Sequence, residues 1–323
     1  MATNKGEYSF STCWNIKEHT VGREMIEEIR SLGFQRVELN YNVTTDLMKT
    51  IEPMIHRGEM GVSSVHNVFP FVPDKRFDTD SVMLGFEEKE LRERAVELLL
   101  GSMEQAYRFG AKAVVVHPGE VPFETNIDEE LKRIYKTEGR ESEAYQKVWE
   151  HMLAKREADS PAYLARIRDS LEEACGYAAR KGWDVAIGIE TRSRCYQIPT
   201  LKEASDMIDS LQGAPVYLWY DIGHGTMMGR MGLYDNVKEV REMKHKIVGV
   251  HIHETIELSD HWCPYVNSKD SSGFDVFLDI IDAAPIKVYE IKAACTAEDI
   301  EESHGIITSK IAALTGSESG SAL

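Results

Sequence analysis

Acidic and histidine side chains recur at the ends of short apolar runs in this sequence. In "VYLWYDIGHG" (216–225), an apolar run is followed by Asp221 and His224. The same arrangement is found at His66, His117, Glu190, His251, His253 and Glu290, and His261 follows shortly afterwards. Six of the eleven histidines therefore lie at or just beyond the end of such a run. Each of them alone could be a hydrogen-bonded core residue, but together they indicate a site.

The apolar runs have the length and the β-branched or aromatic content of strands. They cover residues 8–14, 36–42, 61–67, 111–117, 184–190, 216–221, 247–253 and 287–292. Amphipathic stretches with helical spacing lie between them, at 21–34, 86–110 and 163–182 among others, and several end at a glycine. Eight alternating strand and helix units predict an α/β fold, a single (β/α)8 barrel.

One segment interrupts this alternation. Residues 120–160, between the fourth strand and its helix, are charged and have helical spacing, where such a loop is normally a few residues long. We expect one or two solvated helices there, on the catalytic face of the barrel. The expected organisation is a barrel domain over residues 1–315, with this insertion, and a flexible polar tail over residues 316–323.

The strand ends of such a barrel meet at one face, where its active site lies. Carboxylates crowded there repel one another unless a cation compensates their charge. Imidazoles mixed with carboxylates suit Zn²⁺, Mn²⁺, Fe²⁺ or Co²⁺, whereas Mg²⁺ and Ca²⁺ prefer oxygen ligands alone. The sequence therefore predicts a divalent metal ion as cofactor.

Composition limits the partners. With 37 Lys and Arg against 54 Asp and Glu, the formal net charge is −17, which disfavours binding to the phosphate backbone of nucleic acids. The five cysteines are scattered and form no CxxC pair, so we expect a reducing, cytoplasmic location. No apolar run has the length of a membrane helix. A small molecule is the expected partner, and a homo-oligomer is left open.

Five fragments at successive strand ends carry a family resemblance: "VVVHPGE", "IGIET", "YDIGH", "GVHIHE" and "VYEIK". In this order they resemble the xylose isomerase-like barrel superfamily, which holds sugar isomerases, ketose 3-epimerases, inosose dehydratase-like proteins and endonuclease IV. The resemblance implies that Glu190, Asp221, His251 and Glu290 share one metal ion. It places His253 beyond the ligands.

Endonuclease IV binds further metals through histidines to which His66, His117, His224 and His261 correspond, together with a D-x-H pair. That pair is not intact here, because Asp260 stands directly beside His261. A nuclease or phosphoesterase with several zinc ions therefore remains an alternative, as does a non-catalytic sugar-binding barrel.

The resemblance and the residue types together predict a metal-dependent sugar isomerase or epimerase. Glu190 and Glu290 would exchange a proton with carbon on either side of an enediolate. The substrate would be a sugar, ketose or inosose, bound by His66, His117, His224, Arg192 and Trp14. Arg194 and Lys292 flank the ligands and could bind an acidic group, and Trp262 could stack on a sugar ring. The insertion would act as a lid, or contribute to a partner subunit's site.

Overall fold

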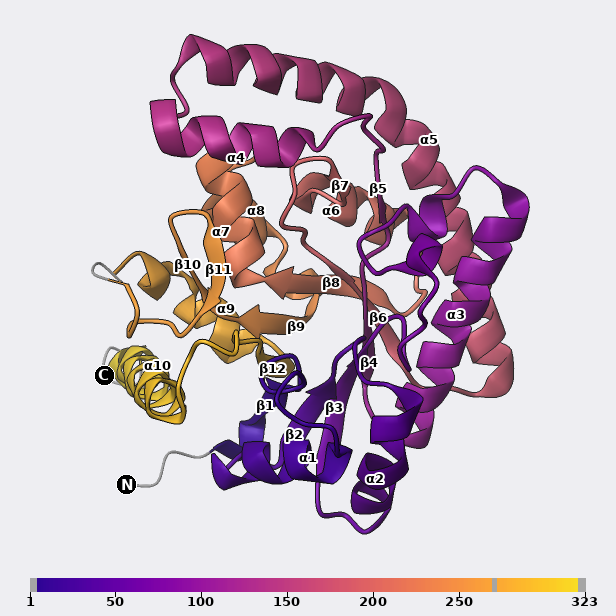
Figure 1. Cartoon of the computed structure of the whole chain (residues 1–323), viewed down its shortest axis with the longest axis vertical. Helices are drawn as coiled ribbons and strands as arrows, with labels where there is room; N and C mark the ends of the chain where they lie inside the picture. Colours follow the sequence, from indigo (N-terminus) through magenta and orange to yellow (C-terminus); the bar gives the residue numbers. More distant parts are fainter. Residues whose placement is uncertain (1–4, 269–271, 319–323) are drawn as a thin grey trace.

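The computed structural model describes residues 5–268 and 272–318. Its centre is a closed barrel of eight parallel strands in the order β1-β12-β9-β8-β6-β4-β3-β2 (Figure 1). These strands are β1 (Tyr8–Ser11), β2 (Arg36–Leu39), β3 (Gly61–His66), β4 (Ala113–Val116), β6 (Ala186–Glu190), β8 (Val216–Asp221), β9 (Ile247–Ile252) and β12 (Ile286–Tyr289). The predicted (β/α)8 barrel and all eight predicted strands are confirmed, each strand to within a few residues.

Helices surround the barrel and connect its strands. They are α1 (Gly22–Ser31), α2 (Thr45–His56), α3 (Lys89–Arg108), α4 (Ile127–Glu138), α5 (Glu143–Lys181), α6 (Leu201–Ser210), α7 (Ile222–Met231), α8 (Asn236–Glu242), α9 (Leu278–Ala283) and α10 (Ala297–Glu318), with short 3-10 turns at Lys5–Glu7, Lys75–Phe77, Met83–Gly85, Lys244–Lys246 and Ser272–Phe277. Local sequence sets several of their ends. Thr200 and Glu203 form a reciprocal capping box at the start of α6, and Gly182 ends α5 in the left-handed conformation.

Two short antiparallel ladders lie at the carboxyl ends of the barrel strands. One pairs β5 (Gly119–Glu120) with β7 (Gln197–Ile198), and the other pairs β10 (Glu254–Ile256) with β11 (Ser259–Trp262). The sequence did not indicate either of them. The second ladder carries Asp260 and His261, which were expected in a loop.

The insertion is packed against the barrel rather than solvated. Helix α4 and the first half of α5 form a layer beyond α7 (Figure 1). Their buried apolar side chains join those of α7, of the loop after β6 and of the turn between β10 and β11 in one cluster: Ile127, Leu131, Ile134, Tyr145, Trp149, Met152, Cys195, Tyr196, Met227, Met228, Met231 and Leu258. Helix α5 then continues past Pro161 for a total of 39 residues, so that the insertion and the barrel helix are one element.

The acidic residues of the insertion do not all face solvent. Asp128 is buried, accepts a hydrogen bond from Cys195 N at 3.0 Å and pairs with Lys132 at 2.7 Å. Glu129, Glu130 and Glu141 are exposed. The insertion is therefore fastened to the loop after β6 by polar contacts as well as by its apolar cluster.

A tryptophan fills the barrel beneath the carboxyl ends of the strands. Trp219 is fully buried, and the absence of side chains at Gly188 and Gly249 makes room for it, since a Cβ at Gly249 would lie 2.3 Å from its ring. Its ring is edge-on to His251, with centroids 5.2 Å apart. Trp219 thus supports the histidine from below.

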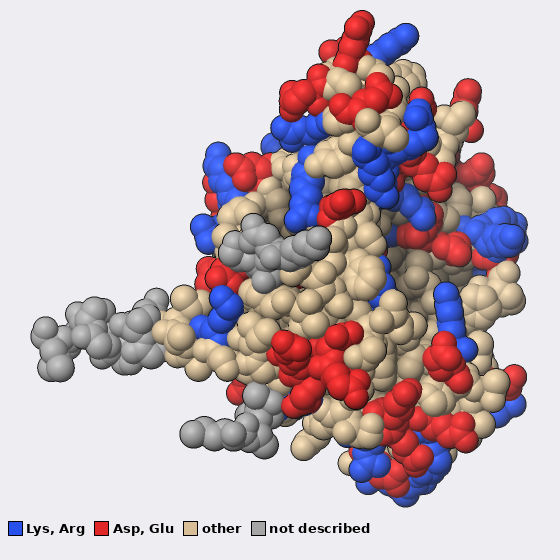
Figure 2. Space-filling model, turned by 60° about the vertical axis from the view of Figure 1, so that its left-hand side comes forward, with Lys and Arg blue, Asp and Glu red and all other residues tan. Residues whose placement is uncertain are grey.

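Helix α10 forms the last described part of the chain. Helix α10 runs to Glu318, so the backbone at 316–318 is helical. Residues 319–323 lie outside the described part, and the flexible tail over 316–323 stays a prediction. Within the described part, no helix has both the length and the apolar character needed to cross a bilayer. On the face seen in Figure 2, acidic and basic side chains are interspersed.

Candidate active site and metal centre

Four side chains meet at the carboxyl ends of four neighbouring strands. Glu190 ends β6, Asp221 ends β8, His251 lies near the end of β9 and Glu290 directly follows β12. One ligand atom from each lies within 4.8 Å of all the others, and all four residues are buried. His251 Nδ1 lies 3.3 Å from Glu190, 3.2 Å from Glu290 and 3.5 Å from Asp221.

This donor set fits a divalent ion. Three carboxylates and one imidazole, nearly removed from water, face the same small space, and burial would strongly penalise that much negative charge without a cation. The mixture of oxygen and nitrogen donors matches the preferences of Zn²⁺, Mn²⁺, Fe²⁺ and Co²⁺. The four residues that the sequence assigned to one ion are therefore together in space.

The pKa values of these groups show how strongly they interact. Burial alone would raise the pKa of Glu190, but the charges of His117 and His251 hold it well below its usual value. Burial raises the pKa of Glu290 to about 7, because the partial compensation by His251 is offset by neighbouring carboxylates such as Glu190. Burial would lower the pKa of His251, yet the surrounding acids, Glu290 foremost, raise it well above normal.

Glu190 is also held by two histidines: His117 directly follows the neighbouring strand β4, and His66 ends β3, the next strand beyond it. His66 Nε2 lies 3.2 Å and His117 Nε2 lies 2.6 Å from the same oxygen, Oε2, of Glu190. The other nitrogen of His66 faces the carbonyl of Asn67 at 3.0 Å, and that of His117 faces Thr79 and Asp80. These three residues form a second group of potential metal ligands.

The segment "DIGH" performs several tasks at once. Asp221 caps α7 by accepting the amide hydrogen of His224 at 2.7 Å, and it also accepts a hydrogen bond from His253 Nε2 at 2.8 Å. Gly223 is required for this approach, because a Cβ there would lie 2.0 Å from the His253 ring. The polar pair after the sixth strand is thus both a helix cap and part of the site.

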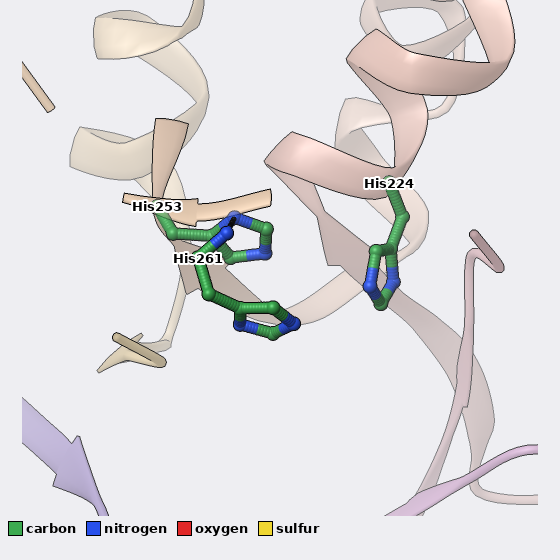
Figure 3. Close-up of side chains that lie close together, drawn as sticks. All are labelled: His224, His253 and His261. Atoms are coloured by element: carbon green, nitrogen blue, oxygen red, sulfur yellow. Dashed lines mark hydrogen bonds between the residues drawn. The ribbon is translucent and has the colours of Figure 1, made fainter. Parts of the chain in front are cut away.

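A third group consists of His224, His253 and His261 (Figure 3). The rings of His253 and His261 are stacked, with centroids 4.2 Å apart, and His224 approaches both nearly edge-on. His253 uses both ring nitrogens, since Nε2 donates to Asp221 and Nδ1 accepts from the His261 amide at 2.9 Å. Both ring nitrogens of His253 are therefore engaged, and its place beyond the ligands stays a prediction.

Burial and neighbouring charge affect this group differently. Burial, with the charge of His253, lowers the pKa of His261 to about 4. Burial would also lower the pKa of His224, but Asp221 and Glu190 raise it to about 9. Asp260 lies 3.8 Å from His224 Nε2. The pKa values of the two histidines are therefore shifted in opposite directions.

A cavity of about 320 Å³ opens beside two of these four residues, Glu190 and Glu290. Its lining includes His66, His117, Glu190, Arg192, His224 and Glu290, all of which the sequence assigned to the site, together with Tyr41, Asp80, Asp260, His261 and Lys292. A wider cleft of about 710 Å³ shares Lys17, Tyr41, Asn42 and Asp80 with this cavity. No residue of 121–160 lines the described cavity, so the proposed lid stays a prediction.

Arg192 is the principal cation inside the cavity. It is buried and forms an ion pair with Asp80, which also contacts Arg194 at 3.4 Å and accepts a hydrogen bond from Gln197 at 3.2 Å. Burial would raise the pKa of Asp80, but Arg192 and His117 hold it far below its usual value. Nε and Nη1 of Arg192 have no hydrogen-bond partner among the described residues, although Nη1 lies 3.7 Å from Glu190 Oε2, so both nitrogens can donate to oxygens of a bound molecule.

Trp14 and Trp262, which the sequence suggested as possible contacts of a sugar, lie in different surroundings. Trp14 does not line the cavity: its ring packs edge-on against Phe10, and its Nε1 donates to the carbonyl of Cys295 at 3.0 Å. The structure therefore places Trp14 in the core, a position that does not support its contact with substrate, which stays a prediction. Trp262 lies beneath Lys292, whose Nζ is 4.2 Å from the ring centre.

Sequence reasoning missed Glu38, Asp80 and Tyr41. Glu38 is fully buried on β2, and its carboxylate is hydrogen-bonded to His251. Asp80 lies in the long loop between β3 and α3. A signal existed for Glu38, since the charged residue in "RVELN" interrupts an apolar strand. No comparable signal marks Asp80 among the other charged residues of its loop.

Comparison with known proteins identifies the family. The sequence model of the family described as "Xylose isomerase-like TIM barrel" matches residues 26–283, which is most of the chain. The chain belongs to this family. A search of curated proteins finds no match.

Solved structures of xylose isomerase-like barrels share the fold at low sequence identity. A D-tagatose 3-epimerase-like protein is 16% identical with a TM-score of 0.66, covering 96% of this chain and 99% of that one. The 3-keto-D-glucoside 4-epimerase from E. coli is 17% identical with a TM-score of 0.63, covering 94% and 100%. An L-ribulose 3-epimerase is 14% identical with a TM-score of 0.58, covering 96% and 93%.

Proposed function

We propose that this protein is a divalent-metal-dependent epimerase or isomerase of a sugar, ketose or inosose. The observation that carries the proposal is the cluster of Glu190, Asp221, His251 and Glu290 at the floor of a polar cavity. The epimerase activities named for the similar structures support the same class of substrate. The reaction would proceed by proton transfer through an enediolate of the substrate.

In this proposal the four residues hold the ion, which supplies positive charge beside a substrate carbonyl and so makes the neighbouring C–H more acidic. Glu190 and Glu290 approach from different strands and would each exchange a proton with carbon, one removing it and the other returning it. His66 and His117 bond to Glu190 and fix the orientation of its carboxylate. The apolar floor made by Trp219 excludes water from below.

Substrate oxygens would be bound by the polar side chains above the ion. Arg192 offers two unpartnered N–H groups, and His66, His117 and His224 line the same cavity. The adjoining cleft contains Lys17, Lys75, Arg76 and Arg194 against Asp78, Asp80 and Glu120. This balance is more basic than that of the whole chain, and it favours a substrate that extends beyond one sugar ring or bears an acidic group.

A phosphoesterase with several zinc ions is the second candidate. The observation in its favour is that the described residues contain three groups of possible ligands rather than one. Against it, His253 has both nitrogens occupied, and the net charge of −17 opposes the approach of nucleic acid. We propose that the partner is a small sugar and that nucleic acid is not bound.

Elemental analysis combined with a substrate screen tests the proposal. Protein purified without chelators should contain one equivalent of Mn²⁺, Zn²⁺, Co²⁺ or Fe²⁺, and the loaded protein should epimerise or isomerise at least one member of a panel of ketoses, keto-glycosides and inososes. Three equivalents of zinc together with cleavage of duplex DNA at abasic sites would favour the second candidate and overturn the first.

A further inference from the structure

A fourth carboxylate lies directly behind the three carboxylates and the histidine of the proposed metal centre. Glu38, on β2, has no exposed surface and lies on the opposite side of His251 from the other acids. His251 Nε2 donates to Glu38 Oε1 at 3.0 Å and lies 3.2 Å from Oε2. Strands β2 and β9 are not neighbours in the barrel, so this contact crosses its interior.

The contact assigns different tasks to the two nitrogens of His251. A carboxylate without a proton can only accept a hydrogen bond, so Nε2 must carry hydrogen where it meets Glu38. Nδ1 faces Glu190, Glu290 and Asp221. In neutral His251 the hydrogen then stays on Nε2, and the lone pair of Nδ1 points at the space that the three acids surround.

Glu38 is itself fixed by a partner on the next strand. Ser64, fully buried on β3, donates its hydroxyl hydrogen to Glu38 Oε2 at 2.8 Å. The carboxylate therefore has a hydrogen-bond donor on each side, and the chain Ser64–Glu38–His251 joins three strands. Trp219, edge-on to His251, restrains the ring further. A charged acceptor held this way orients an imidazole more firmly than a neutral acceptor would.

We propose that Glu38 is a positioning residue of the metal centre: it holds His251 in the Nε2–H form with Nδ1 directed at the ion. The inference rests on the proposed function, since it assumes an ion bound by His251. It assigns a role to a residue that touches neither the ion nor the substrate. Outer partners of metal-binding histidines typically change metal affinity by about 10- to 100-fold when removed.

Replacing Glu38 by glutamine tests this role. The Glu38→Gln side chain keeps its size and can still accept from His251, but it loses the charge and offers the histidine a competing N–H group. Binding of Co²⁺ alone would be measured on the full chain by competition with a chromophoric chelator. We expect Co²⁺ affinity about 10- to 100-fold weaker than in wild type, with changed visible absorption bands of the bound ion.

Two further variants separate positioning from folding. Asp128→Asn removes another buried carboxylate, in the insertion, and should bind Co²⁺ as wild type does. Ser64→Ala leaves Glu38 charged but less restrained, and we expect a loss of affinity smaller than that of Glu38→Gln. If Glu38→Gln does not fold, as judged by circular dichroism, Ser64→Ala decides alone, and wild-type affinity in that variant overturns the inference.

The results also distinguish this inference from the proposed function. Wild-type protein that binds no Co²⁺ would overturn the proposed metal centre itself. Wild-type protein that binds Co²⁺, with a folded Glu38→Gln variant of equal affinity and unchanged absorption bands, would overturn only the role of Glu38. Once a substrate is known, Glu38→Gln measured at saturating metal should lower kcat more than it raises KM, since Glu38 does not line the cavity.

Discussion

Shortening a single buried side chain of the insertion tests whether α4 supports the barrel or covers its mouth. Leu131 is fully buried in the cluster that α4 and α5 form with Met227, Met228 and Met231 of α7. His224 lies in the first turn of the same helix α7, and its amide is held by Asp221. Leu131→Ala would leave a cavity between the insertion and the element that presents the site.

The magnitude follows from complete burial. Large-to-small changes of this kind cost about 2–5 kcal/mol, because both transfer free energy and packing are lost. In a chain of this size we expect the melting temperature to fall by roughly 4–10 °C. Since no residue of 121–160 lines the described cavity, KM should stay within about twofold of wild type at temperatures where the variant is folded.

Calorimetry or urea unfolding, followed by steady-state kinetics on a substrate from the screen, measures both effects. Lys136→Ala, on the exposed side of α4, is the matched control and should change stability by no more than about 0.5 kcal/mol. A several-fold rise in KM for Leu131→Ala without loss of stability would refute this reasoning and favour the lid.

Four other changes have defined outcomes. Glu290→Gln and Asp221→Asn should each abolish stoichiometric metal binding, measured by elemental analysis, because each removes one charged donor from the four. Arg192→Lys should raise KM by about tenfold, because it removes the Nε and Nη1 N–H groups that have no hydrogen-bond partner in the structure and would bind substrate oxygens. Unchanged kinetics would exclude a contact between Arg192 and the substrate. Burial, with the charge of Lys5, lowers the pKa of His304 to about 4. Between about pH 6.5 and 4 the unfolded chain therefore binds a proton at His304 that the folded chain does not. The free energy of unfolding should fall by on the order of 1–3 kcal/mol as the pH drops through this window. In urea unfolding, His304→Gln should make the free energy of unfolding less dependent on pH over the same window.

The sequence predicted the barrel because each of its strands is a short apolar run. Parallel strands in a barrel present their carboxyl ends at one face, so Glu190, Asp221, His251 and Glu290 lie close together, as expected from their places at strand ends. That these four residues bind a metal ion, and that His253 lies beyond them, stay predictions.

The remaining features depend on contacts between distant segments. Trp14 and a substrate-binding tryptophan look alike in sequence, and only the fold shows that Trp14 bonds to Cys295. The insertion at 120–160 and the barrel helix at 163–182 were expected as separate segments, but α5 passes through Pro161 and joins them. Trp149 and Met152 are packed before the proline, and Ile167 and Leu171 after it. Such packing outweighs the local cost of proline.

Turnover in D₂O is the measurement that tests the central claim most directly. Protein loaded with its metal ion would be incubated with a true substrate, and both recovered substrate and product would be analysed by mass spectrometry and NMR. Proton exchange through Glu190 and Glu290 predicts deuterium at the carbon beside the carbonyl. Complete turnover without deuterium in either compound would contradict it, and would instead indicate a hydride shift or hydrolysis.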